Sequence, residues 1–98
     1  DGARSPFDQL ADIVEAVGDR VDVICEGGIQ RGTHMLKALS LGAKACAGGR
    51  LYLYALAAAG QIGVEKALSI YKTELERDMK LMGCKKISDL SKNNIKFK

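Results

Sequence analysis

The sequence predicts an α/β fold in which two short parallel strands are flanked by helices. Residues 21–25 (VDVIC) and 43–47 (AKACA) are short, largely apolar segments, and each is followed by a pair of glycines. Between them, residues 33–41 (THMLKALSL) carry apolar side chains at helical spacing, and Gly42 follows where a C-cap glycine is common. Strands that alternate with helices at this spacing indicate a parallel sheet with right-handed crossovers. Both glycine pairs should therefore leave the sheet at its carboxyl edge.

The first helix is expected over residues 5–17. Ser5 and Pro6 are favoured as N-cap and first helical residue, and Asp8 places a carboxylate beside the positive end of the helix dipole. Gly18 follows the last turn and should end the helix. The apolar stripe of this helix consists of Phe7, Leu10, Val14 and Val17.

The longest helix is expected over residues 64–82. Its apolar residues recur on one face, and most of its charged residues fall outside that stripe, as in a helix that packs on a core. We assign to the core the stripe formed by Val64, Leu68, Tyr71, Leu75, Met79 and Met82. Tyr52 and Tyr54 follow the second glycine pair and are also interpreted as structural.

The two glycine loops predict a phosphate-binding site. Gly27 and Gly28 follow the first predicted strand, and Gly48 and Gly49 follow the second, with Arg50 directly after them. Paired glycines allow the backbone to approach an anion closely, and the N–H groups at the start of the following helix point toward it. Arg50 adds a charge-assisted contact to phosphate oxygens. One glycine pair is a weak signal, but two at neighbouring strand ends are a stronger one.

The composition is that of an ordinary globular domain. Apolar residues make up 47% of the 98 residues, charged residues make up 28%, and the formal net charge is +3. Aromatic residues, at 5%, leave little for stacking on nucleic-acid bases, and no apolar run approaches the ~18 residues of a membrane span. We therefore expect no nucleic-acid partner, no membrane span and a cytoplasmic location.

The cysteines and the histidine carry no chemical motif. Cys25, Cys46 and Cys84 lack metal-ligand or redox spacing, and two of them lie in predicted strands, where a free cysteine behaves as a small buried apolar residue. His34, the only histidine, lies at a predicted helix start and is assigned no catalytic role. No metal site is predicted.

Nearly the whole chain, residues 1–95, resembles the C-terminal end of one flavoenzyme family. The resemblance rests on residues 26–43 (EGGIQRGTHMLKALSLGA), on Gly49-Arg50, and on residues 53–60 and 63–68 (LYALAAAG and GVEKAL). These are similar to the FMN-dependent 2-hydroxy-acid dehydrogenases and oxidases, which include glycolate oxidase, lactate oxidase and the flavin domain of lactate dehydrogenase. The family pattern is Asp-Gly-Gly-x-Arg-Arg-Gly-x-Asp-x-x-Lys-Ala-Leu-Ala-Leu-Gly-Ala, followed by Ile-Gly-Arg-Pro.

The resemblance implies that the chain is the C-terminal fragment of a TIM (β/α)8 barrel. Such a barrel needs roughly 250 residues, with its phosphate site after strands seven and eight. Residues 5–17 would be the sixth helix, the two predicted strands the seventh and eighth, and residues 64–82 the last helix. The chain would then be a single partial domain over residues 1–98, running from the sixth helix to the C-terminus.

The resemblance further implies an enzyme that uses FMN to oxidise a small 2-hydroxy acid to a 2-oxo acid. In the family, a His-Gly-x-Arg-Gln-x-Asp segment supplies the catalytic base and the substrate-binding arginine, and Asp1 aligns with its last residue. No catalytic residue is therefore expected within this chain, and the isolated chain is expected to be inactive. A homo-oligomer is expected, because a fragment of a sheet leaves strand edges and apolar faces uncovered.

The expected cofactor site departs from the family pattern at two positions. The resemblance assigns FMN binding to Glu26, Gly27, Gly28, Gln30, Arg31, Gly49 and Arg50. Glu26 replaces the family's aspartate, and Gln30 replaces the first arginine of the Arg-Arg pair, which the family uses near the phosphate. Arg50, helped by Arg31, would then carry the positive charge.

Two alternatives stay open at this point. The chain could be a binding module that holds FMN or another phosphorylated ligand without turnover. It could also belong to another phosphate-binding flavoprotein TIM barrel, such as one like inosine-monophosphate dehydrogenase. The helix 33–41 and residues 51–58 (LYLYALAA) favour the hydroxy-acid family.

Overall fold

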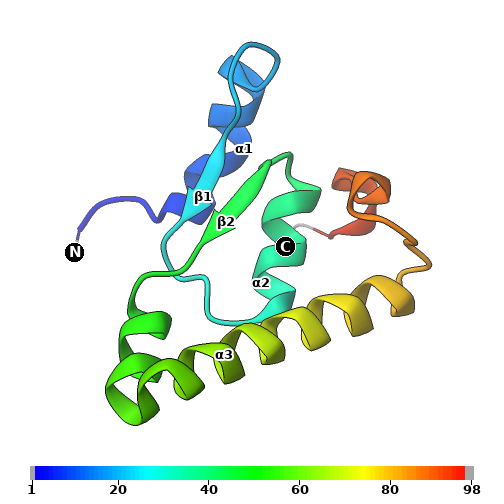
Figure 1. The fold of residues 1–98 in the computed structure, drawn as a ribbon. Helices are drawn as coiled ribbons and strands as arrows, with labels where there is room; N and C mark the ends of the chain where they lie inside the picture. Colours follow the sequence, from blue (N-terminus) through cyan, green and yellow to red (C-terminus); the bar gives the residue numbers. More distant parts are fainter. Residues whose placement is uncertain (1, 97–98) are drawn as a thin grey trace.

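Two parallel strands lie at the centre of the molecule, and helices pack against them (Figure 1). The computed structural model describes residues 2–96; Asp1, on which the alignment with the family's upstream segment depends, lies outside that range. The elements in chain order are α1 (Pro6–Val17), β1 (Ile24–Glu26), α2 (Gly32–Ser40), β2 (Ala45–Ala47) and α3 (Arg50–Leu81). Two short 3-10 turns follow, at Ile87–Asp89 and Lys92–Asn94.

The strands pair in parallel, which confirms the sequence prediction, but both are shorter than predicted. Cys25 lies opposite Cys46, and Glu26 lies opposite Ala47. Residues 21–23 and 43–44 were predicted as strand and are not, because only three positions of each segment find a partner in the ladder. One backbone hydrogen bond continues the pairing beyond the two strands: the Lys44 N–H donates to the Val23 carbonyl at 2.8 Å.

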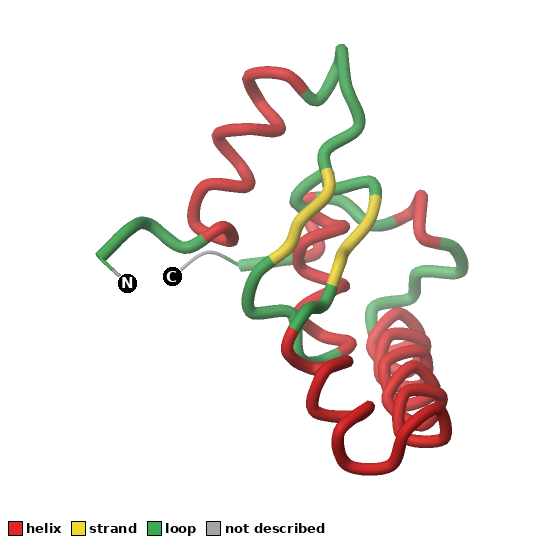
Figure 2. The backbone as a smooth tube through the Cα atoms, turned by 60° about the vertical axis from the view of Figure 1, so that its left-hand side comes forward, coloured by secondary structure: helices red, strands yellow, loops and turns green. Residues whose placement is uncertain are grey.

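The helices α1 and α2 pack on one face of the strands, and the opposite face is open. Cys25 points to the covered face and is 3% exposed, whereas its neighbour Ile24 points the other way and is 63% exposed. Figure 2 shows the two strands side by side with α1 and α2 beside them. The core on the covered face consists of Leu10, Cys25, Ile29, Ala38, Leu41 and Ala43.

The ends of α1 and α2 follow the signals in the sequence. The Ser5 hydroxyl accepts the Asp8 N–H at 3.1 Å, and Pro6 is the first helical residue, as predicted. Gly42 follows α2 with φ +106°, a conformation that favours glycine. A side chain there would also meet Val14 of α1, because a Cβ at Gly42 would come within 2.7 Å of the Val14 Cγ1. Gly42 therefore both ends α2 and allows α1 to approach it.

The last helix differs most from its prediction. The structure extends α3 from Arg50 to Leu81, so helix begins fourteen residues before the predicted start at position 64. The two helical pieces meet at a kink where Ala59 and Gly60 leave helical geometry, and Gly60 has φ +58°. Gly63 lies directly against the first piece, because a Cβ there would come within 2.1 Å of the Ala55 carbonyl oxygen. These glycines interrupt the apolar pattern, which is why the first piece was missed.

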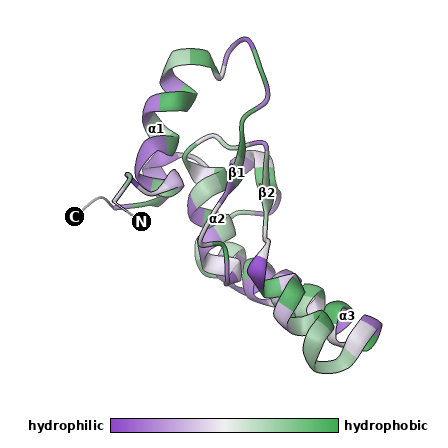
Figure 3. Cartoon of the chain, turned by 90° about the vertical axis from the view of Figure 1, so that its left-hand side faces the viewer, coloured by the Kyte–Doolittle hydropathy of each residue, from purple (hydrophilic) through white to green (hydrophobic). Residues whose placement is uncertain are grey.

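The predicted core stripe of α3 is buried only in its second half. Tyr71 and Met79 are buried, but Leu68 is 48% exposed, so its assignment to the core was wrong. No other described element covers that part of α3, which projects from the strands with apolar residues on its surface (Figure 3). Within residues 2–96, no helix has both the length and the apolar character that crossing a membrane requires.

Candidate functional site

The two glycine loops begin side by side, as the parallel arrangement predicts. β1 ends at Glu26 and β2 ends at Ala47, and these two residues are partners in the ladder. The first loop then runs to Gly32, where α2 begins, and the second runs to Arg50, where α3 begins. Each loop therefore connects a strand end to a helix start at the same edge of the sheet.

A hollow of about 290 Å³ lies between the two loops. Every residue that the sequence assigned to the cofactor lines it except Arg31: these are Glu26, Gly27, Gly28, Gln30, Gly49 and Arg50. Residues separated by more than twenty positions thus surround one space, as a phosphate-binding site between two loops requires.

The first glycine pair is required by the backbone. Gly27 and Gly28 have φ values of +115° and +72°, which side chains rarely tolerate. A Cβ at Gly27 would come within 2.7 Å of the Pro6 Cγ, whereas a Cβ at Gly28 would meet no atom within 4 Å. Gly27 therefore packs against the start of α1, and Gly28 faces open space where a ligand has room.

The second loop contributes the cation. Arg50 is the first residue of α3, its side chain is exposed, and within residues 2–96 it takes part in no ion pair. Glu26 lies close to this loop, because a Cβ at Gly49 would be 3.5 Å from the Glu26 Oε1. An ionised carboxylate only accepts hydrogen bonds, so Glu26 suits a ligand hydroxyl and Arg50 suits a phosphate.

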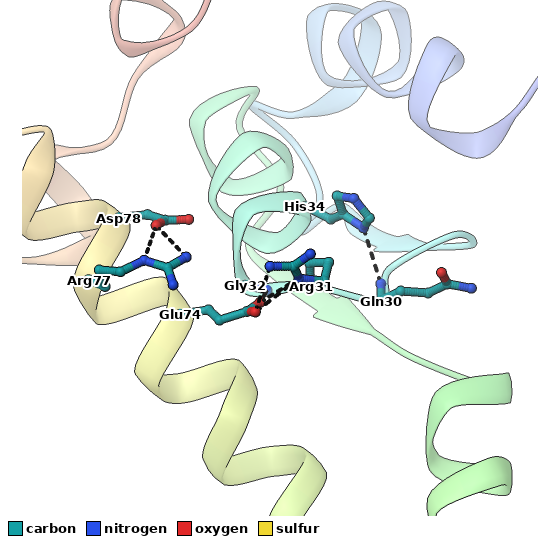
Figure 4. Close-up of polar contacts among 7 residues, drawn as sticks. All are labelled: Gln30, Arg31, Gly32, His34, Glu74, Arg77 and Asp78. Atoms are coloured by element: carbon teal, nitrogen blue, oxygen red, sulfur yellow. Dashed lines mark hydrogen bonds and ion pairs between the residues drawn. The ribbon is translucent and has the colours of Figure 1, made fainter.

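Arg31 pairs with an acidic residue of α3. Its guanidinium Nε donates to both carboxylate oxygens of Glu74 of α3, at 2.9 Å to Oε1 and 3.1 Å to Oε2 (Figure 4). The Glu74 carboxylate also accepts the Gly32 N–H at 2.8 Å. The hydrogen bond from Arg31, and then the one from Gly32, lower the pKa of Glu74. The hydrogen bond to Glu74 in turn raises the pKa of Arg31. Arg31 thus joins the loop to α3.

Tyr71 makes a second connection between α3 and the first loop. Its hydroxyl is buried and donates to the Ile29 carbonyl at 2.8 Å. The Tyr71 ring also meets Tyr52 edge to face, with centroids 6.3 Å apart. Tyr52 in turn packs beside the second loop, since a Cβ at Gly48 would lie 3.3 Å from the Tyr52 ring. Tyr71 and Glu74 therefore hold the loop that lines the hollow, and no sequence motif indicated this role.

A second hollow, of about 540 Å³, adjoins the first. The two share Gly27, Gly28 and Arg50, and the second adds His34 and Lys37 from α2. The His34 Nδ1 accepts the Gln30 N–H at 3.2 Å (Figure 4). Lys37 was not singled out from the sequence, because its position in the middle of α2 looks like that of an ordinary surface lysine.

The cysteines are free thiols, and the structure supports their structural assignment. Cys25 and Cys84 are buried, and Cys46 is half-buried beside Cys25. Burial, and then the neighbouring Cys25, raise the pKa of Cys46 to about 11, and burial also raises the pKa of Cys25. A raised pKa keeps a thiol protonated and unreactive at neutral pH. Among residues 2–96, no three metal-ligating side chains gather at one point.

Glycine loops at the ends of neighbouring parallel strands, with an arginine directly after the second loop, are typical of phosphate-binding α/β proteins. The chain belongs to the FMN-dependent dehydrogenase family, which it matches over residues 1–97. The cofactor of this family is FMN.

Individual relatives agree with this assignment. The chain is 43% identical over 92% of its length to an L-lactate oxidase from Nostoc sp., of which it covers 25%. It is 42% identical over 98% of its length to human 2-hydroxyacid oxidase 1 and covers 26% of that protein. It is 41% identical over 93% of its length to L-lactate dehydrogenase (cytochrome) from Wickerhamomyces anomalus and covers 17% of it.

Solved structures show the same backbone. The flavin-binding domain of baker's yeast flavocytochrome b2 superposes with a TM-score of 0.88 at 42% identity, over 95% of this chain and 25% of that one. A soluble mutant of (S)-mandelate dehydrogenase from Pseudomonas putida gives a TM-score of 0.93 at 37% identity, over 99% of this chain and 27% of that one. The chain therefore spans between 17% and 27% of the length of these relatives.

Proposed function

We propose that this chain forms the FMN-phosphate-binding end of an FMN-dependent 2-hydroxy-acid dehydrogenase or oxidase. The observation that carries the proposal is the hollow between the two loops, which Gly28, Gly49 and Arg50 line together. The residues present fit a phosphate ester. Gly28 leaves open space beside its backbone, and the guanidinium of Arg50 has no ion pair within the described residues.

Each residue of the hollow has a distinct part in this proposal. Arg50 and the loop N–H groups hold the phosphate oxygens, and the Gln30 carboxamide donates a further, uncharged hydrogen bond. The Glu26 carboxylate accepts from a hydroxyl of the ribityl chain. When bound, FMN supplies the two-electron oxidation of the hydroxy acid, and this chain fixes the position of the cofactor through its phosphate end.

The proposal extends to the fold of the intact protein. β1 and β2 would be the seventh and eighth strands of a TIM barrel, and α1 its sixth helix, so that residues 1–98 are one partial domain. The open face that exposes Ile24 and the unpaired strand edges are what such a barrel would cover. The proposal assigns no described residue as the base that accepts the substrate proton, and the part given to this chain is to bind the cofactor.

The substrate proposed is a small 2-hydroxy acid, as the names of the lactate and 2-hydroxyacid oxidases indicate for those relatives. A second candidate is a flavoprotein of the same family with another substrate. The chain is 43% identical over 97% of its length to pre-mycofactocin synthase of Mycolicibacterium smegmatis, whose name refers to no hydroxy acid. Turnover by the intact protein with lactate or glycolate as substrate separates the two candidates.

Titration of the chain with FMN, followed by flavin fluorescence, tests the proposed site. We expect saturable binding that Arg50→Ala weakens by about 1.5 kcal/mol, the lower end for a charged hydrogen bond, because Arg50 is exposed. Lys44→Ala is the matched control, since Lys44 is exposed and lines neither hollow. Equal affinity of the Arg50→Ala variant and the parent chain would contradict the proposed site.

A further inference from the structure

The second hollow differs from the first in its charge. The first includes the carboxylate of Glu26, whereas no carboxylate lines the second. Lys37 and Arg50 line the second from two different helices, and neither takes part in an ion pair within residues 2–96. Two cations that face one concave space without a counter-ion attract an anion. An anion held by Arg50 is therefore favoured on the side that faces Lys37, away from Glu26.

His34 adds a polar ring to the lining of the second hollow. Its Nδ1 accepts the Gln30 N–H at 3.2 Å, so Nδ1 carries no proton. The neutral ring must then carry its proton on Nε2, which is a hydrogen-bond donor. His34 thus holds the first loop through one nitrogen and offers a donor through the other, beside Lys37 and Arg50 in the second hollow.

We propose that Lys37 and His34 are further phosphate-binding residues, and that the phosphate lies between Arg50 and Lys37. This inference rests on the proposed function and refines it. Gln30 brings no charge to the first loop, and Lys37 supplies from α2 the second positive charge that a phosphate dianion requires. The ligand class is a phosphate monoester, and the flavin part of the ligand makes no contact with Lys37.

The experiment compares FMN with riboflavin, which lacks the phosphate, on the full chain and its variants. Lys37→Ala should raise the Kd for FMN about tenfold, equivalent to 1.4 kcal/mol, and leave the Kd for riboflavin unchanged. Lys37→Arg should restore FMN binding, because it keeps the charge. Lys44→Ala should change neither Kd. The loss caused by Lys37→Ala should shrink at high salt, because the lysine is exposed and its attraction to phosphate is screened.

Further variants test the remaining parts of the proposal. His34→Leu removes the ring donor, so it should weaken FMN binding and spare riboflavin binding, whereas His34→Asn, which keeps an uncharged donor and acceptor, should bind FMN more tightly than His34→Leu. In a Gln30→Arg background, Lys37→Ala should cost less than in the parent chain, because the new arginine supplies the charge that Lys37 would otherwise supply. Circular dichroism of every variant should match that of the parent chain.

The outcomes separate this inference from the proposed function. If Arg50→Ala weakens FMN binding and Lys37→Ala does not, the phosphate site stands and the role of Lys37 is overturned. If Lys37→Ala weakens FMN and riboflavin binding equally, the lysine does not contact phosphate, and the inference is again overturned. If the folded parent chain binds neither FMN nor inorganic phosphate, the proposed function itself fails.

Discussion

At the scale of single residues, the backbone of the first loop adopts positive φ at two successive positions, and both are glycine. Gly27 and Gly28 stood out in the sequence because paired glycines after a strand have few structural explanations, and their positive φ values confirm the need for glycine. Arg31 and Arg50 are equally basic in the sequence, yet only Arg50 lines the hollow. Nothing local separates the two arginines, because the partner of Arg31 is Glu74, 43 positions away.

The two glycines of the first pair should respond differently to alanine. Gly27→Ala should lower the free energy of unfolding by about 1–3 kcal/mol, because it combines an unfavourable φ with a contact to Pro6. Gly28→Ala should cost less, since its φ of +72° lies near the left-handed region and its Cβ would meet no atom within 4 Å. Urea unfolding of both variants gives the comparison. Equal losses would show that the Pro6 contact contributes nothing.

At the scale of elements, α3 does more than complete the core. It begins at the second glycine loop with Arg50, turns back at Gly60, and then holds the first loop through Tyr71 and Glu74. One helix therefore fixes both loops relative to each other. The strand order and the helix α2 followed from local patterns of apolar residues and glycines. The long-range contacts of α3 did not, because they depend on where the kink at Gly60 sends the chain.

The contact between Glu74 and the first loop should make stability depend on pH in a defined direction. The pKa of Glu74 is lowered in the folded state, so its stabilisation is fully present above the unfolded value of about 4.3 and is lost as pH falls through the folded value. Glu74→Gln keeps an acceptor for the Gly32 N–H but loses the ion pair with Arg31. The variant should be less stable than the parent chain at pH 7, and the difference should disappear in acid.

Thermal unfolding of the two chains between pH 7 and pH 3 provides the measurement. Glu76→Gln is the control, because Glu76 is exposed and its only ion pair within the described residues is a 3.9 Å contact with Lys72. A difference between Glu74→Gln and the parent chain that stays constant over this range would show that the ionisation of Glu74 does not stabilise the loop.

At the scale of the whole molecule, the surface leaves one face of the sheet and several large apolar side chains uncovered. The sheet has two strands, its face at Ile24 is open, and large apolar side chains such as Leu53 and Ile62 are 62% and 75% exposed. The chain covers 25% of the L-lactate oxidase and 25% of the flavocytochrome b2 domain, which agrees with a surface that leaves apolar side chains uncovered. The sequence predicted the open sheet because only two strand segments are present, but it assigned Leu68 to the core because helical periodicity cannot tell which element covers a face.

These uncovered surfaces should cause the chain to self-associate. Exposed strand edges and apolar patches favour pairing with another copy, so sedimentation velocity should show a species larger than a monomer that grows with concentration. Ile24→Lys places a charge on the sheet face, and Ile62→Lys places one just after the kink of α3. The variant that restores the monomer identifies the surface in contact. Lys85→Ala, in the exposed tail, should leave the association unchanged. A parent chain that sediments as a monomer at every concentration would contradict this prediction.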